Sequence, residues 1–366
     1  MAGLLFCAAI IFRSGAFTER ADFLSIQRGV VLETDNSLLS PDPAVGNLYL
    51  GRQFIEIELT TGEFAGQRFR IDNTLSRFFN NKAEEGMEML FHVNIQDGSV
   101  FMIQVFGHSR DVFMFAFVAF FALMLIAVGR KKGLYSFIAL MFTMAVIVFF
   151  MIPLIVEGHD PVILAVVTAI LTTVFSILLV SDVSMKSAAA IGGTVAGVAV
   201  AGAVGITAGQ LAHISGMHMD HAQELIHQQG MDGMIRLPSL LFAGIIIASL
   251  GAVMDVGMSI ASSVFEMKRV NPGLPRKELY KSGMNIGRDI IGTMSNTLIL
   301  AFAGSSITVL IIIALYELPY IRLINMNLLA VEVIQGLSAS IGLILTVPLT
   351  ALFAAWFADK DKKAAS

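Results

Sequence analysis

The sequence predicts a polytopic α-helical membrane protein with seven transmembrane helices, a short N-terminal hydrophobic segment and a small extracytoplasmic β domain. The composition supports this class, because 56% of the residues are hydrophobic, only 14% are charged and the mean hydropathy is +0.77. Such values are typical of chains that lie largely within lipid. Long apolar segments follow residue 111, whereas many residues before it alternate between apolar and polar side chains.

Seven apolar segments approach or exceed the length that a spanning helix requires, which is about 20 residues. They lie at 112–129, 134–155, 162–181, 188–211, 238–262, 290–315 and 328–357. Together they form a transmembrane domain at residues 112–359, followed by a cytoplasmic tail at 360–366. Residues 263–289 contain the amphipathic stretch RKELYKSGMN, so we expect this connection to lie along the cytoplasmic membrane surface.

Basic residues are concentrated in alternate connections between these segments. Because Lys and Arg near the ends of spans favour the cytoplasmic side, those connections and the C-terminus are predicted to be cytoplasmic. Only Arg236 and Arg322 lie in the opposing short loops. It follows that residues 14–111 lie outside. The basic residues of the predicted cytoplasmic side are Arg130, Lys131, Lys132, Lys186, Lys268, Arg269, Arg276, Lys277, Lys281, Arg288, Lys360, Lys362 and Lys363.

The N-terminal residues 1–13 contain the apolar stretch MAGLLFCAAIIF, which is shorter than a spanning helix. We interpret it as a partial transmembrane helix or as an interfacial segment. It has neither a basic n-region nor a small-residue cleavage site, so a signal peptide is not predicted. Cys7 is the only cysteine, and the outer domain therefore cannot hold an internal disulfide.

Residues 14–111 are predicted to form the extracytoplasmic β domain. In FIEIELTTG, Ile55, Ile57 and Leu59 alternate with acidic residues, which is the period of a half-buried strand. In MEMLFHVNIQDGSVFMIQVF, two apolar runs flank the dipeptide Asp97-Gly98, and this pattern predicts a β-hairpin. A segment of about 80 residues can bury a small core, so we expect a barrel or sandwich of about five strands.

A carboxyl group lies in the middle of the fifth apolar segment. Asp255 is separated from Lys268 by about 20 Å at the helical rise of about 1.5 Å per residue, which places it near the centre of the bilayer. A carboxylate at that depth costs at least about 2.5 kcal/mol, so it must face protein or water. On the same helix face, Ser259, Ser262 and Glu266 continue a polar stripe towards the cytoplasm.

The following apolar segment brings a second polar face to a similar depth. We interpret Asp255 as a carboxyl that exchanges a proton, because removal from water favours its protonated form. Its predicted partners are Asn296, Thr293 and Thr297. The alternative is that Asp255 only hydrogen-bonds Asn296 or Thr293 and holds two helices together. Arg288 and Asp289, on the same segment, are secondary candidates.

Two further patterns occur in apolar segments. Glu332 is flanked by apolar residues near the outer end of the last segment, and Gln335 extends its polar face, so both are secondary candidates or simply interfacial residues. Small residues at every fourth position predict a close-packing face, or alternatively a sliding surface in a rocking transporter. These small residues are Gly193, Gly197, Ala201, Gly205 and Gly209.

Histidine and methionine gather in the predicted outer loop HISGMHMDHAQELIHQQGMDGM. Imidazole and thioether ligands suit copper, so a metal site at His218, His221, Met217 and Met219 is one hypothesis. The spacing fits no closed site, however, and residues 220–229 are equally compatible with a short amphipathic helix. No other cofactor is expected.

No CxxC, HExxH, P-loop or GxSxG pattern occurs in the chain. Motif-bearing hydrolases and nucleotide-driven pumps are therefore not favoured, and we expect no enzymatic activity and no catalytic residues. The expected partners are the lipid bilayer, a small substrate or ion and an envelope protein at the β domain, but not nucleic acid.

Long blocks of the chain resemble the YibE/F-like family of bacterial membrane proteins. The blocks are FAGIIIASLGAVMDVGMSIASSVFE at 242–266, SGMNIGRDIIGTMSNTLILAFAGSS at 282–306 and the later VEVIQGLSASIGLILTVPLTAL. The β segment ahead of the first span is also similar. This resemblance implies a multipass transporter of the bacterial cytoplasmic membrane, and it implies no particular substrate.

A second resemblance concerns mechanism. In RND permeases and the translocon accessory SecD, an outer domain precedes a helix whose intramembrane Asp is followed by a cytoplasmic charged cluster. Asp255, Glu266 and Lys268 resemble that order, although Val256 follows Asp255 where those proteins have a second polar residue. We therefore expect an ion-coupled, specifically proton-coupled, secondary transporter. The alternative is a non-transport scaffold or translocation accessory whose β domain docks envelope partners.

Overall fold

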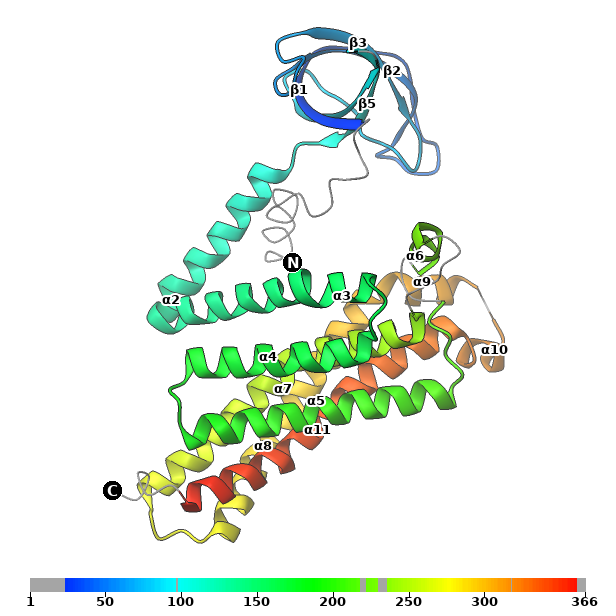
Figure 1. Ribbon diagram of the computed structural model, residues 1–366. Helices are drawn as coiled ribbons and strands as arrows, with labels where there is room; N and C mark the ends of the chain where they lie inside the picture. Colours follow the sequence, from blue (N-terminus) through cyan, green and yellow to red (C-terminus); the bar gives the residue numbers. More distant parts are fainter. Residues whose placement is uncertain (1–23, 97, 218–221, 230–235, 317, 361–366) are drawn as a thin grey trace. The chain divides into compact units, whose positions relative to one another are not determined.

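The computed structural model describes residues 24–96, 98–217, 222–229, 236–316 and 318–360 (Figure 1). The chain forms two compact units that divide after Leu123. The first contains five strands and the second contains most of the helices. The N-terminal residues 1–13 and the tail 361–366 lie outside the described residues.

The first unit is a curled antiparallel sheet of five strands in the order β3-β2-β1-β4-β5. The long strand β1 pairs with β4 along its first half and with β2 along its second half. Two register shifts interrupt the pairing of β1 with β2. This order is that of a five-stranded OB-type barrel. The strands are β1 (Leu24–Pro41), β2 (Tyr49–Leu59), β3 (Arg68–Leu75), β4 (Glu88–Gln96) and β5 (Ser99–His108).

The predicted β domain is confirmed in its strand content. Ile55, Ile57 and Leu59 of β2 are at most 1% exposed, because their alternation directs all three into the barrel core. The predicted hairpin is present as β4 and β5, and Gly98 between them has a φ of +73°, a conformation that favours glycine.

A buried ion pair fixes two loops of the barrel. Asp42 follows β1, its side chain is fully buried, and it accepts hydrogen bonds from Arg77 Nε at 2.5 Å and from the Ala44 amide at 2.8 Å. Hydrogen bonding by the Arg77 guanidinium lowers the pKa of Asp42 to about 2. Because the folded state lowers this pKa below its ordinary value of 3.8, the stabilisation is present above about pH 4 and is lost as pH falls towards 2.

We expect Asp42→Asn to loosen the loops that follow β1 and β3 at neutral pH, because an amide cannot replace the charge-assisted bonds to Arg77. Amide hydrogen exchange, corrected for intrinsic rates, should be faster there in the variant. Acidification from pH 4 to pH 2 should reproduce the effect in wild type. Glu58→Gln is the control, because Glu58 pairs with Arg68 on the surface at 3.1 Å. Equal protection in wild type and Asp42→Asn would refute the assignment.

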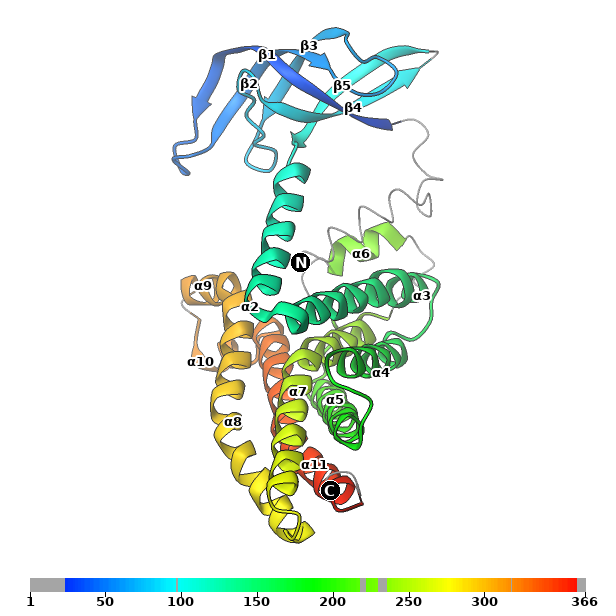
Figure 2. The ribbon, with the colours of Figure 1, turned by 90° about the vertical axis from the view of Figure 1, so that its left-hand side faces the viewer.

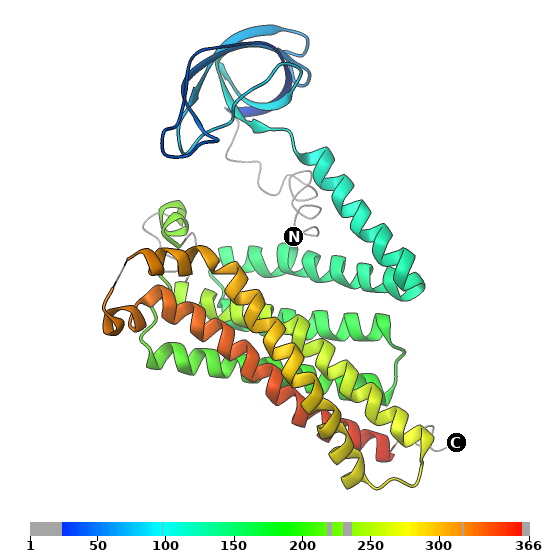
Figure 3. The ribbon, with the colours of Figure 1, turned by 180° about the vertical axis from the view of Figure 1, so that it is seen from behind.

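The second unit is built from long helices, of which α2 begins in the first unit (Figure 1). Figures 1 and 3 show α11 running alongside α5 and α8, and α11 also contacts α7. The elements are α2 (Asp111–Val146), the π-helical segment η2 (Ile147–Met151), α3 (Ile152–Val156), α4 (Pro161–Val180), α5 (Met185–Leu211), α6 (Ala222–Gln229), α7 (Leu237–Val270), α8 (Arg276–Ser305), α9 (Ile307–Leu315), α10 (Tyr320–Ile324) and α11 (Asn327–Lys360).

Five helical runs in the described residues are long and apolar enough to cross a membrane, or six if the bent pair α8 and α9 counts as one span. The predicted number of seven is therefore not confirmed. The first two predicted spans lie in one helical run, Asp111–Val156, which is interrupted at Arg130 with φ 49° and ψ −130°. The predicted span 290–315 is not straight, because α8 and α9 meet at an angle of 61°.

The connection between α7 and α8 is shorter than predicted. Helix α7 continues to Val270 and α8 begins at Arg276, so the amphipathic stretch RKELYKSGMN belongs to α8. Lys268 is buried where α7 meets the end of α11, and its Nζ lies 3.0 Å from the Leu274 carbonyl and 3.8 Å from Asp359. These contacts fix the ends of α7 and α11 together.

The face of α5 that carries the ladder of small residues is buried against α7 and α11. A methyl group added at Gly197 would lie 1.8 Å from Thr346 Oγ1, and one added at Gly193 would lie 1.9 Å from Thr350 Oγ1. Ala201 lies against Gly342 of α11, whereas Gly205 and Gly209 face Ile245 and Phe242 of α7. One side of α7 is therefore occupied by the contact with α5, and the polar residues Asp255 and Ser259 lie on its exposed side.

Candidate functional site

Asp255 lies near the middle of α7, as the predicted depth requires, and it lies on the exposed side of that helix. Its neighbours Val256 and Gly257 point into the bundle, where Gly257 packs against Thr194 of α5. No hydrogen bond or ion pair joins Asp255 to another described residue. The carboxyl is thus positioned by the packing of the opposite face of α7 rather than by a polar partner.

The exposed side of α7 forms a stripe that we call the Asp255 stripe. Its members are small or polar and recur at spacings of three or four residues from Gly244 to Ser259, with Glu266 two turns further on. The stripe consists of Gly244, Ala248, Gly251, Asp255, Ser259 and Glu266, and the half-buried Ser262 borders it. Gly244 and Gly251 have no other group within 4 Å of an added methyl group, so the stripe is open at these two positions.

The stripe ends in a hollow between α7 and α8, where Figure 2 shows the two helices side by side near their connection. The hollow has a volume of about 650 Å³, and its polar lining includes Ser262, Glu266 and Asn271. Ser262 lies seven residues from Asp255, which is about 10 Å along a helix. The exposed Ser259 lies between them, so small and polar residues extend along α7 from the hollow towards Asp255.

The polar face of α8 is also exposed, but it does not contact Asp255 through a hydrogen bond. The Thr293 hydroxyl donates to the Ile290 carbonyl at 3.1 Å, and the Thr297 hydroxyl donates to the Thr293 carbonyl at 2.9 Å. Asn296 makes no side-chain hydrogen bond within the described residues. Among the described residues, no hydrogen bond therefore joins Asp255 to Asn296 or Thr293, and both threonine hydroxyls donate within their own helix.

The two secondary candidates on α8 occupy this exposed face as well. Arg288 donates to Asn285 Oδ1 at 3.0 Å, and Asp289 is exposed beside it. They lie closer to the start of α8 than Thr293. The structure therefore places charged groups and neutral polar groups in succession along the same exposed side of α8.

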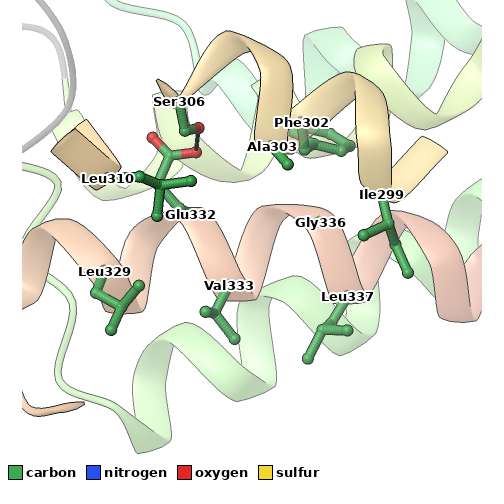
Figure 4. Close-up of a pocket in the computed structure, with 10 residues that line it drawn as sticks. All are labelled: Ile299, Phe302, Ala303, Ser306, Leu310, Leu329, Glu332, Val333, Gly336 and Leu337. Carbon is green, nitrogen blue, oxygen red and sulfur yellow. Dashed lines mark hydrogen bonds between the residues drawn. The ribbon is translucent and has the colours of Figure 1, made fainter. Parts of the chain in front are cut away.

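A second polar pair lies at the bend between α8 and α9. The Ser306 hydroxyl donates to the Glu332 carboxylate of α11, and Figure 4 shows the two groups facing each other. Ser306 is 6% exposed and is the residue at which the span turns. Our sequence interpretation did not include Ser306, although the run Gly304-Ser305-Ser306 within an apolar segment is a signal for a kink.

The remaining candidates contribute less. Gln335 is half-buried one turn beyond Glu332. Of the four residues of the copper hypothesis, Met217 is exposed, and His218, Met219 and His221 lie outside the described residues. Within the described ranges, no group of three or more His, Cys, Asp or Glu side chains could hold a metal ion.

These features define a class of protein: a multipass membrane protein with a separate β domain, carboxyl groups within its long helices and one bent span. The model of the YibE/F-like protein family matches residues 117–360, and the chain therefore belongs to the YibE/F-like family. The matched region covers the helices and leaves out the β domain. No curated protein and no solved structure matches the chain.

Proposed function

We propose that the protein is a proton-coupled secondary transporter of the bacterial cytoplasmic membrane, with Asp255 as the coupling carboxyl. The observation that carries this proposal is the position of the Asp255 carboxyl, which lies on the exposed side of α7 in line with Ser259 and the hollow and has no hydrogen-bonding partner among the described residues. The family supports the membrane class, and the coupling mechanism is argued from the residues alone.

The energetics of an intramembrane carboxyl favour a role in coupling. A charged Asp at the bilayer centre costs at least about 2.5 kcal/mol, so Asp255 requires either water or a proton. Water in the hollow would reach the end of the Asp255 stripe at Glu266 and supply that proton. A carboxyl that is alternately hydrated and shielded gains and loses a proton as the bundle rearranges, and this couples proton movement to a conformational change.

The exposed position of Asp255 weighs against the scaffold alternative. If Asp255 served only to join helices, it would be tightly packed and hydrogen-bonded to a neighbouring helix. It is instead exposed and makes no hydrogen bond to another described residue. A group that is kept in the membrane without a structural partner is better explained by a functional requirement.

The proposal is tested with purified protein in vesicles that contain a pH-sensitive dye. Small cations, anions and amphiphilic solutes are added outside, and both solute uptake and the internal pH are followed. We expect at least one solute to enter together with, or in exchange for, protons. Vesicles without protein provide the control. Solute uptake that is insensitive to an imposed pH gradient would contradict proton coupling.

The orientation in the membrane is part of the same proposal. With a cytoplasmic C-terminus, single cysteines introduced at Lys131 or Lys277 in a Cys7→Ser background should react with an impermeant maleimide only from the cytoplasmic side. A cysteine at Asp220 should react only from outside, because the basic residues favour the opposite ends of the spans. Labelling of position 220 from the cytoplasm would overturn this topology.

A further inference from the structure

A pocket at the bend between α8 and α9 contains Glu332 as its only ionisable lining residue. Its volume is about 320 Å³, and it lies between the end of α8, the start of α9 and the first turns of α11 (Figure 4). This volume is near the lower limit for pockets that hold small organic ligands, about 300 Å³. The site is separate from Asp255, which does not line it.

The walls of this pocket are otherwise almost entirely apolar. They are formed mainly by Ile299, Phe302, Leu310, Leu329, Val333 and Leu337. Polar lining atoms come from Glu332 and from Ser306, whose hydroxyl donates to the carboxylate. None of the described residues that line the pocket is Lys, Arg or His, so Glu332 has no cationic partner among them.

We propose that this pocket binds a lipophilic organic cation with a single positive charge. One carboxylate against apolar walls selects a ligand that carries one positive charge and buries apolar substituents. Phe302 adds an aromatic ring that can lie against the cation. A hard metal ion is a poor fit, because Ca²⁺ requires six or more oxygen ligands and Mg²⁺ requires an octahedral set.

The bend in the span creates this combination. Helix α8 ends at Ser306, and α9 continues at an angle of 61° to it. The pocket lies between this bend and the first turns of α11. The Ser306 hydroxyl donates a hydrogen bond to the Glu332 carboxylate next to the start of α9. Apolar side chains of α8, α9 and α11 form the walls of the pocket. Discontinuous helices with a polar group at the break are a recurring way to build binding sites in transporters.

This inference goes beyond the proposed proton coupling, because binding at equilibrium requires neither a pH gradient nor Asp255. It is tested by equilibrium binding of radiolabelled tetraphenylphosphonium to the purified full-length protein. We expect saturable binding to wild type. Tetraphenylborate has the same shape and the opposite charge, and in a separate experiment without the cation it should show no saturable binding.

Three variants assign the site. Glu332→Gln keeps an acceptor for the Ser306 hydroxyl but removes the charge, and it should weaken binding about tenfold or more. Asp255→Asn removes a different intramembrane carboxyl and should leave binding unchanged. Ala303→Leu should also weaken binding, because Ala303 lines the pocket and a larger side chain would fill it.

Several results would overturn the assignment. Absence of saturable binding to wild type, or equal affinity in wild type and Glu332→Gln, would refute a role for the carboxylate. Saturable binding of tetraphenylborate measured alone would show an apolar surface that does not select for positive charge. An equal loss in Asp255→Asn would place the cation elsewhere. Size-exclusion profiles that match wild type establish that each variant is folded.

Discussion

Asp255→Asn should abolish the proton dependence of transport while the protein remains folded and inserted in the membrane. The amide keeps the shape and much of the hydrogen-bonding capacity of the carboxyl, and it removes a group that is costly to ionise in lipid. Folding should therefore be unimpaired or slightly improved. Coupling should be lost, because the amide of Asn does not take up and release a proton in the physiological pH range.

The measurement is solute flux in reconstituted vesicles at several external pH values, with wild type and variant at equal protein content. Asp182→Asn is the matched control. Asp182 is exposed in the connection between α4 and α5 and belongs to neither the Asp255 stripe nor the hollow. Its loss should leave the pH dependence intact. Equal flux and equal pH dependence in wild type and Asp255→Asn would refute the assignment of the coupling carboxyl.

The second large effect is expected at the contact of α5 with α7 and α11. In Gly197→Ala, the new methyl group would lie 1.8 Å from Thr346 Oγ1 and 3.0 Å from Val253. Two helices would have to move at once, and overpacking of this kind costs about 1–3 kcal/mol. We expect a clear fall in the thermal midpoint of the detergent-purified protein.

The control for this prediction is the same substitution on an open side of a helix. Gly244 of α7 has no group within 4 Å of an added methyl group. Because alanine favours the helical conformation over glycine by about 1 kcal/mol, Gly244→Ala should be neutral or mildly stabilising. A Gly197→Ala protein as stable as Gly244→Ala would show that α5 is not packed as closely as the structure indicates.

The sequence by itself determined the membrane class, the strands β2, β4 and β5 of the β domain and the position of Asp255 along its helix. Each depends on local properties: the length of an apolar run, the period-2 alternation of Ile55, Ile57 and Leu59, and the rise of a helix. The resemblance of three long blocks to the YibE/F-like family was likewise readable in the chain and is confirmed by the family match.

The tertiary structure decided which polar groups meet. The sequence predicted a similar depth for Asp255 and Asn296, but the orientation of each helix about its axis depends on packing against α5 and α11. That packing leaves Asp255 exposed without a hydrogen-bonding partner within the described residues. Conversely, Ser306 and Glu332 are 26 residues apart and meet only because the span bends between α8 and α9. Hydropathy cannot predict such a bend, because an apolar segment has the same composition whether it is straight or broken.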